Sequence, residues 1–213
     1  DNRITVQVET ASLLSRHGRG AEAETYLKNA LSDSSPKARA TLLSVLAQMY
    51  AVDNRYGAEE LLKQAVESNM QAFDRRGPNV AQSLLDLGSY YAVQNQNNRA
   101  EETLLETLPL LDEFDESDMY DSEILLVTAQ TLLGSVQYRL KKYAAAEEAL
   151  TTAIRLSHDK PKLISLYRGA LIVLGRLLQE THREAETREL EEKLKASDGM
   201  MGDLGIDAEP TSN

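Results

Sequence analysis

The chain has 213 residues, no cysteine, no tryptophan and a formal net charge of −11. The lack of cysteine excludes disulfides and thiolate metal sites, and the acidic balance disfavours sequence-independent binding to nucleic acid. No apolar run approaches the ~20 residues of a membrane helix and no signal peptide is found, so we expect no membrane association and a cytoplasmic protein, with export or an organelle after removal of a targeting segment as the alternative.

Internal repetition organises the predicted elements. "YAVDN" at 50–54 returns as "YAVQN" at 91–95, and the flanks of both copies align as a helix, a short polar turn and a second helix that opens with Ala-Glu. A third copy is "AQTLLGSVQYRLKKYAAAEEALTTAI", and weaker copies precede and follow these three. We expect one superhelical domain over residues 1–195, with hairpins at about 4–34, 36–74, 78–116, 121–157 and 161–195, followed by a C-terminal tail at 196–213.

Small residues recur where the helices of these hairpins would approach closely. In the first helices they are Ala11, Ala47, Gly88, Gly134 and Gly175, and in the second helices Ala23, Ala58, Ala100, Ala146 and Ala185. Leucines at helical spacing complete an apolar stripe in the three central copies. Prolines at 36, 78 and 161 stand where new hairpins begin. The last second helix has lost the leucine register and is polar, so we expect it to cap the stack.

The pattern resembles the tetratricopeptide repeat (TPR). The resemblance rests on the Leu-Gly pairs Leu87-Gly88 and Leu133-Gly134, the aromatic residues Tyr50 and Tyr91, and the alanines that open the second helices. The long period is similar to that of the kinesin-light-chain-like branch, with repeats of about 42 residues. The resemblance implies an all-α fold, a right-handed α-solenoid of about five hairpins with a C-terminal capping helix.

The resemblance also implies which side chains line a concave groove formed by the first helices. Carried over to this sequence, these positions are Ser12, Arg16, Ser44, Gln48, Gln82, Leu85, Ser89, Thr128, Thr131, Ser135, Tyr138, Arg139, Arg168, Ile172, Arg176 and Gln179. Arginines stand at both ends of the set, with small hydroxyl or amide side chains between them. Since guanidinium groups pair with carboxylates, we expect an acidic or carboxyl-bearing peptide there; the alternative is an ordinary solvated helix face.

An acidic segment lies near the middle of the chain. Residues 79–125 hold 11 acids and one base. Within them, "DEFDESDMYDSE" at 112–123 has the length and acidic ends of a calcium loop, but Phe114 and Ser117 replace a ligand and the required glycine. We therefore expect a solvated loop and no metal site, with contact to a basic partner as the alternative.

No residue pattern for catalysis stands out. His17, His158 and His182 do not share a metal-ligand spacing, and there is no phosphate loop or nucleophile elbow, so we expect no enzyme activity, no cofactor and no metal. We expect a protein-interaction scaffold that binds a partner protein or peptide in the groove. The alternative is an assembly subunit that self-associates or stacks in a larger complex. The tail, with Leu204 and Ile206, is a further candidate for docking on the superhelix.

Overall fold

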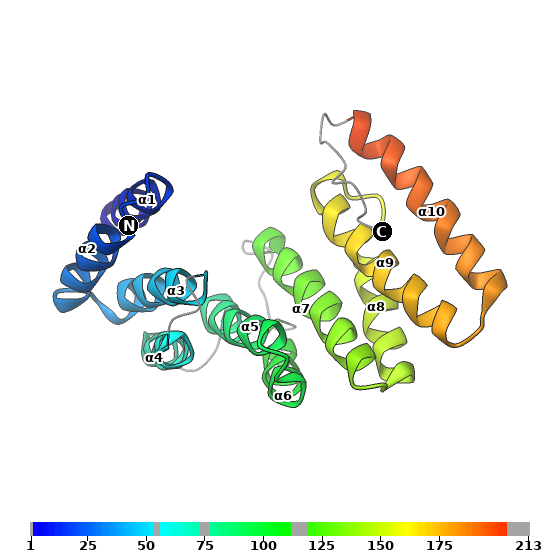
Figure 1. Cartoon of the computed structure of the whole chain (residues 1–213), viewed down its shortest axis with the longest axis horizontal. Helices are drawn as coiled ribbons and strands as arrows, with labels where there is room; N and C mark the ends of the chain where they lie inside the picture. Colours follow the sequence, from blue (N-terminus) through cyan, green and yellow to red (C-terminus); the bar gives the residue numbers. More distant parts are fainter. Residues whose placement is uncertain (1, 53–55, 73–76, 112–118, 204–213) are drawn as a thin grey trace. The chain divides into compact units, whose positions relative to one another are not determined.

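The computed structural model describes residues 2–52, 56–72, 77–111 and 119–203, which form helices joined by short turns, with no strand among them (Figure 1). The all-α prediction is confirmed. Pro36, Pro78 and Pro161 each begin a helix, as predicted. The helices are α1 (Asn2–Arg16), α2 (Gly20–Ser32), α3 (Pro36–Val52), α4 (Ala58–Ala72), α5 (Pro78–Val93), α6 (Asn97–Thr107), η1 (Leu108–Leu110), α7 (Met119–Arg139), α8 (Tyr143–Ser157), η2 (Pro161–Leu163), α9 (Ile164–Glu180) and α10 (Glu184–Asp203).

The chain divides into two compact units, Asp1–Gln94 and Asn95–Asn213, here called unit 1 and unit 2. Unit 1 holds α1 to α5 and unit 2 holds α6 to α10. The odd-numbered α-helices are the first helices of the sequence repeats, and the even-numbered α-helices are the second helices. The handedness of a superhelix formed by both units stays a prediction.

Unit 1 is built by helices that pack on their neighbours in the sequence, with α3 also contacting α1 and α5. Its core contains Ala11 of α1, Ala23 and Leu27 of α2, and Leu42 and Leu46 of α3. The three leucines are fully buried. At about 2 kcal/mol for each buried leucine side chain, they are a main source of this unit's stability. Ala11 and Ala23 lie at the predicted small positions, where α1 meets α2.

Unit 2 has the same arrangement around α7, α8 and α9. A Cβ atom added to Gly134 would stand 2.5 Å from Cγ of Leu150, so α7 and α8 approach more closely there than any larger residue allows. Leu150, Ala146 and Ala153 of α8 form one cluster with residues of α9. α10 packs on α9 through Leu190 and Leu194 and continues past Lys195, the last residue of the predicted domain, to Asp203. The tail residues Leu204 and Ile206 lie outside the described residues.

A left-handed residue marks several of the turns within hairpins. Gly18, Asn95, Lys141 and His182 have φ between 56° and 74°, and the buried small residue of the second helix follows five positions later. These buried residues are Ala23, Ala100, Ala146 and, in the last helix, Thr187. The prediction for α10 was therefore wrong by two residues, because Ala185 is exposed and Thr187 faces the core.

A carboxylate beside the small residue of the second helix joins successive hairpins. In unit 1 the Tyr50 hydroxyl donates to Glu24 at 2.7 Å, and the Tyr91 hydroxyl donates to Glu59 at 3.3 Å. In unit 2, Lys142 pairs with Glu101 at 2.5 Å, and Arg183 pairs with Glu147 at 2.6 Å. We call these four interactions the junction contacts. They give the repeated pentapeptide a structural role, since its tyrosine both packs between helices and bonds to the preceding hairpin.

Candidate functional site

The residues predicted to line a groove all lie on first helices. Arg16, Gln48, Gln82 and Ser89 belong to unit 1. Seven belong to unit 2: Thr131, Ser135, Tyr138, Arg139, Arg168, Arg176 and Gln179. We call the side of the first helices that carries these residues the first-helix face. One part of it belongs to unit 1 and the other to unit 2.

In unit 1 the structure brings Arg16 and Gln48 together. They line an open cavity of about 370 Å³ with Ser12 of α1 and with Val45 and Met49 of α3. Arg16 and Gln48 are exposed, whereas Val45 and Met49 are half-buried. A guanidinium and an amide above an apolar floor can hold a carboxylate and a peptide bond of an extended chain. Gln82 and Ser89 lie on α5, outside this cavity.

An acid that the sequence interpretation missed lies on the same face of unit 1. Gln82 donates from Nε2 to Oδ1 of Asp86 at 2.8 Å. Burial raises the pKa of the Asp86 carboxyl, and hydrogen bonds from Gln82 and Ser44 only partly oppose this. Asp86 stands four residues after Gln82, so its place on this face could have been read from the helical spacing. Because ionised Asp86 is costly where it lies, a hydrogen bond donated to it by a ligand would stabilise the carboxylate.

The hydroxyl groups of unit 2 are already engaged with their own helix. Thr131 donates to the Val127 carbonyl at 2.8 Å, and Ser135 donates to the Thr131 carbonyl at 2.8 Å. Toward a ligand these hydroxyls therefore offer lone pairs and no proton. Both side chains are half-buried and small, and the room that they leave for a ligand beside α7 stays a prediction.

At the C-terminal ends of α7 and α9, Tyr138 lies beside the Glu180 carboxylate, and the charge of Arg176 acts on Tyr138. The Tyr143 hydroxyl donates to Oε1 of Glu180 at 2.7 Å. The hydrogen bond from Tyr143, followed by that from Tyr138, lowers the pKa of Glu180. Glu180 raises the pKa of the Tyr138 hydroxyl, and the positive charge of Arg176 partly offsets this rise. Neither Glu180 nor Tyr143 was predicted, since both depend on how α8 and α9 pack.

The remaining predicted residues of unit 2 are placed differently. Arg168 faces α10, where its Nη1 donates to Oγ of Ser197 at 2.8 Å and pairs with Asp198; only 11% of its side chain is exposed. Its guanidinium therefore anchors the last helix. Gln179 lines a cavity of about 330 Å³ beside the start of α10. Arg139 is exposed at the end of α7.

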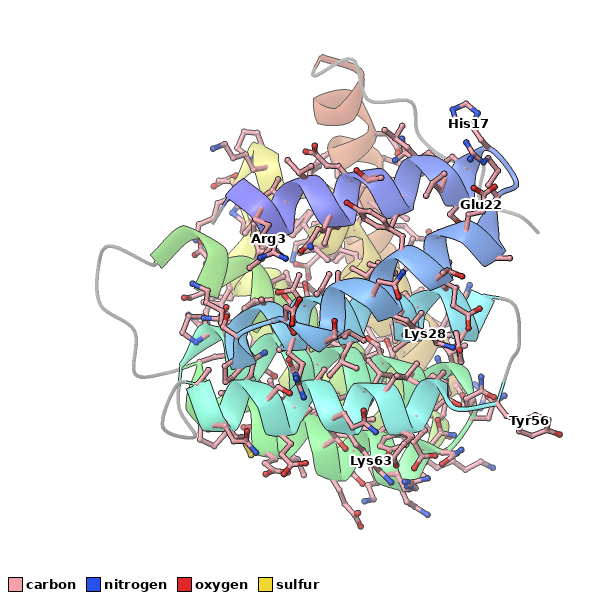
Figure 2. All side chains as sticks on the ribbon, turned by 90° about the vertical axis from the view of Figure 1, so that its left-hand side faces the viewer. Arg3, His17, Glu22, Lys28, Tyr56 and Lys63 are labelled. Carbon is pink, nitrogen blue, oxygen red and sulfur yellow. The ribbon has the colours of Figure 1, made fainter. Side chains whose placement is uncertain are left out.

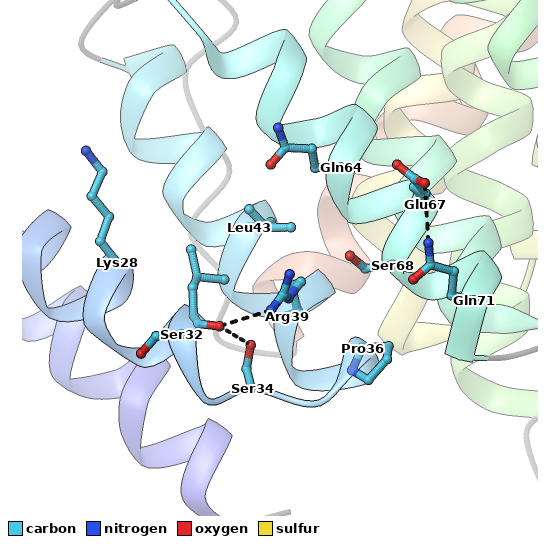
Figure 3. Close-up of a pocket in the computed structure, with 11 residues that line it drawn as sticks. Lys28, Ser32, Ser34, Pro36, Arg39, Leu43, Gln64, Glu67, Ser68 and Gln71 are labelled. Carbon is cyan, nitrogen blue, oxygen red and sulfur yellow. Dashed lines mark hydrogen bonds between the residues drawn. The ribbon is translucent and has the colours of Figure 1, made fainter.

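A larger cavity, of about 840 Å³, lies in unit 1 between the second helices α2 and α4, over the start of α3 (Figure 3). Its rim includes Lys28 and Arg39, but Lys28 pairs with Glu24 at 2.6 Å and Arg39 donates to the Leu31 carbonyl at 3.4 Å. Gln71 likewise donates to Glu67 on α4. No repeated motif indicated this cavity, because second helices and a linker supply its walls.

The described ranges contain no cluster of three His, Asp or Glu side chains that could hold a metal ion. The acidic stretch considered as a calcium loop lies largely outside these ranges, over 112–118. His17 and His182 are exposed in turns, and His158 contacts Asp159 at 2.8 Å. No helix of the described chain is both long and apolar enough to cross a bilayer.

No protein-family model and no curated protein matches the chain. Several solved structures share its fold. The TPR-like repeats of a Podosopora anserina protein described as a kinesin light chain superpose with a TM-score of 0.73 at 20% identity, over 94% of this chain and 96% of that one. BtubC (BKLC) from P. vanneervenii superposes with a TM-score of 0.76 at 18% identity, over 100% of this chain and 84% of that one. YrrB, described as a TPR protein with an unusual peptide-binding site, superposes with a TM-score of 0.51 at 17% identity, over 92% of this chain and 86% of that one.

These similarities confirm the predicted TPR-like helical-repeat fold. Structures related to kinesin light chain are among those that share it. At 20% identity or less, the likeness concerns the fold and leaves the function to be argued from the residues of this chain.

Proposed function

We propose that the chain is a non-enzymatic interaction scaffold that binds a partner peptide on its first-helix face. The observation that carries this proposal is the cavity between α1 and α3, where Arg16 and Gln48 come from successive first helices above Val45 and Met49. Helical-repeat folds present such surfaces to extended partners. YrrB, which shares the fold, is described as having a peptide-binding site, and this adds support.

The chemistry of this face indicates what the peptide should carry. Arg16 suits a carboxylate, either an acidic side chain or a C-terminus. Asp86, with its raised pKa, suits a hydrogen-bond donor on the same peptide. We therefore propose a peptide with a carboxylate at one end and a polar or basic residue further along, a finer pattern than acidity alone.

Selection of peptides from a displayed library on the whole chain tests the proposal. Enriched peptides are then measured by fluorescence polarisation against Arg16→Glu and Gln48→Ala, and against Arg39→Glu at the cavity between α2 and α4. We expect Arg16→Glu to weaken binding by about 10-fold or more, because a charged hydrogen bond contributes about 1.5–3 kcal/mol. Arg188→Glu is the matched control, since Arg188 is 78% exposed on α10 and does not line this cavity.

Three outcomes decide the matter. Loss with Arg16→Glu alone supports the site between α1 and α3. Loss with Arg39→Glu and retention with Arg16→Glu would move the site to the cavity between α2 and α4. Peptides that bind Arg16→Glu, Gln48→Ala and Arg39→Glu as they bind the original chain would refute a site on either surface.

A further inference from the structure

The cavity between α2 and α4 in unit 1 is large enough for a ligand. Its volume is about 840 Å³, and ligand sites commonly enclose about 300–1,000 Å³. α2, α3 and α4 follow one another in the chain, so the cavity lies inside the series of hairpins. Figure 2 shows Lys28 on α2 and Lys63 on α4, the two helices that flank the cavity, and Figure 3 shows its lining.

In unit 2, side chains fill the corresponding place between α8, α9 and α10. Tyr167 of α9 is only 6% exposed and forms one cluster with Leu171. Ile154 of α8 and Leu194 of α10 pack against this cluster. An aromatic ring from the first helix therefore occupies the space between the two second helices that flank it.

The repeat positions show why unit 1 is different. Arg39 stands eight residues before the small residue Ala47, which is the position that Tyr167 holds in α9. On α4, Ala65 stands where α10 has Leu194, seven residues after the small residue of the second helix. The other first helices α5 and α7 have apolar residues at the position of Arg39: Val80 and Leu126. Unit 1 therefore lacks the ring and the leucine that fill this place in unit 2.

Arg39 is exposed at the cavity and weakly held by the fold. Within the described chain, its one side-chain hydrogen bond runs from Nη2 to the Leu31 carbonyl at 3.4 Å, which is long for such a bond. A guanidinium carries five N–H donors, so the fold leaves most of those of Arg39 unused. Lys28 adds a second positive charge to the same rim, although Glu24 partly neutralises it. This side of the cavity therefore suits a carboxylate.

The opposite wall, on α4, offers hydrogen-bond acceptors. Ser68 is only 7% exposed and lines the cavity, and its hydroxyl has no hydrogen-bond partner among the described residues. Ser197, at the same repeat position in α10, accepts a hydrogen bond from Nη1 of Arg168 at 2.8 Å. Gln71 donates from Nε2 to Glu67, so its amide oxygen remains an acceptor. An N–H donor of a ligand therefore fits this wall, and the charge of Glu67 disfavours a carboxylate there.

We propose that this cavity binds a segment of a partner protein in which an aromatic residue stands next to an acidic one. The ring fills the space that Tyr167 fills in unit 2, and it packs on Leu31 and Leu43. The carboxylate pairs with Arg39, and a main-chain N–H donates to Ser68. The cavity is separate from the first-helix face, so neither proposal depends on the other.

A displayed peptide library selected on the whole 213-residue chain is the probe. Its members carry a fixed Tyr-Glu or Glu-Tyr pair between varied residues, and a reference library carries Ala-Ala in place of the pair. We expect enrichment from the first library and saturable binding of the enriched peptides in fluorescence polarisation. Arg39→Glu should weaken this binding by about 10-fold or more, because it removes a charged hydrogen bond. Arg16→Glu, at the cavity between α1 and α3, should leave it unchanged.

Two further variants separate this site from a general attraction of charges. Arg39→Tyr gives α3 the residue that α9 has, and we expect it to abolish binding because the new ring takes the place of the ligand's ring. Ser68→Ala should weaken binding by about 2- to 10-fold, because it removes one hydrogen bond. Circular dichroism checks that each variant keeps the helix content of the original chain.

A charge exchange completes the test. A peptide with lysine in place of its glutamate should regain affinity for Arg39→Glu. Equal enrichment from the two libraries, or binding that neither Arg39→Glu nor Arg39→Tyr weakens, overturns the proposal. Binding that Arg16→Glu weakens overturns it too, and assigns the peptides to the first-helix face. The two proposals can therefore fail separately.

Discussion

The two units make the same junction contact with different chemistry. In unit 1, Glu24 and Glu59 accept a hydrogen bond from a tyrosine of the next first helix, and each also pairs with a lysine four residues on in its own helix. In unit 2, Glu101 and Glu147 pair with a cation from the turn before the next second helix. The glutamate that follows the small alanine is thus the same in both units, whereas its partner is a tyrosine in unit 1 and a cation in unit 2. A neutral phenol is insensitive to salt, whereas an ion pair is screened by it.

The acids on the first-helix face differ between the units too. Asp86 in unit 1 has a raised pKa because it is buried, whereas Glu180 in unit 2 has a lowered pKa because tyrosine hydroxyls donate to it. Both carboxyl groups accept hydrogen bonds within the fold, but burial makes ionised Asp86 costly, whereas the hydrogen bonds outweigh burial at Glu180. The two acids therefore respond oppositely to the loss of their charge, and a test through pH can tell them apart.

The largest expected effect concerns the close approach of helices in unit 2. Gly134→Ala puts a Cβ atom 2.5 Å from Cγ of Leu150, so Leu150 or the helix must move. We expect a loss of about 1–3 kcal/mol in the free energy of unfolding, typical of overpacking. Gly175→Ala is the matched control, because its Cβ would meet nothing within 4 Å and the better helix former should stabilise by up to ~1 kcal/mol. Urea unfolding followed by circular dichroism measures both, and equal effects would contradict this packing.

The junction contact of unit 1 is tested by Tyr50→Phe. The change removes the hydroxyl that donates to Glu24 at 2.7 Å and keeps the ring. We expect a loss of about 1 kcal/mol that is the same in 0.05 M and 1 M NaCl. Tyr56→Phe serves as the control, since Tyr56 is fully exposed and should not change the unfolding midpoint. A strongly salt-dependent loss would mean that charge, and not the phenol, dominates this junction.

The junction contact of unit 2 should respond to salt. Arg183→Gln removes a guanidinium that joins Glu147 to Glu186. Because its side chain is 35% exposed, we expect a small drop in the urea unfolding midpoint at low salt and a smaller drop in 1 M NaCl. Arg188→Gln is the control, since that side chain is 78% exposed and 3.8 Å from Glu184. Amide hydrogen exchange in α8 and α9 localises the effect.

Much of the fold was predictable because its signals are local and repeated. Prolines at helix starts, alanines at close approaches and the pentapeptide each return at equivalent places. The prediction for α10 failed because Ala185 continues the Ala-Glu phrase, whereas the count from the left-handed residue His182 gives Thr187. Turn geometry fixes the register more reliably than a short phrase does.

The site was less predictable, because it depends on which partners side chains find across helices. Helical spacing placed Arg16 and Gln48 on one face, and the structure brings them together at one cavity. Spacing could not show that Arg168 turns to Ser197, 29 residues nearer the C-terminus, or that Tyr143 reaches Glu180. Nor could it give the burial of Asp86, which depends on how α3 and α5 pack.

The smallest expected effects compare the two acids through pH. The pKa of Asp86 is raised above its ordinary 3.8, so ionisation costs stability at neutral pH and the cost fades as pH falls through the folded-state pKa. We expect Asp86→Asn, which still accepts from Gln82, to raise the melting temperature at pH 7 and to have no effect below pH 3.8. The pKa of Glu180 is lowered from its ordinary 4.5, so its stabilisation is complete above pH 4.5 and is lost as pH falls further. Glu180→Gln should therefore lower the melting temperature at pH 7. If both variants shift the melting temperature at pH 7 in the same direction, the stated difference between Asp86 and Glu180 is wrong.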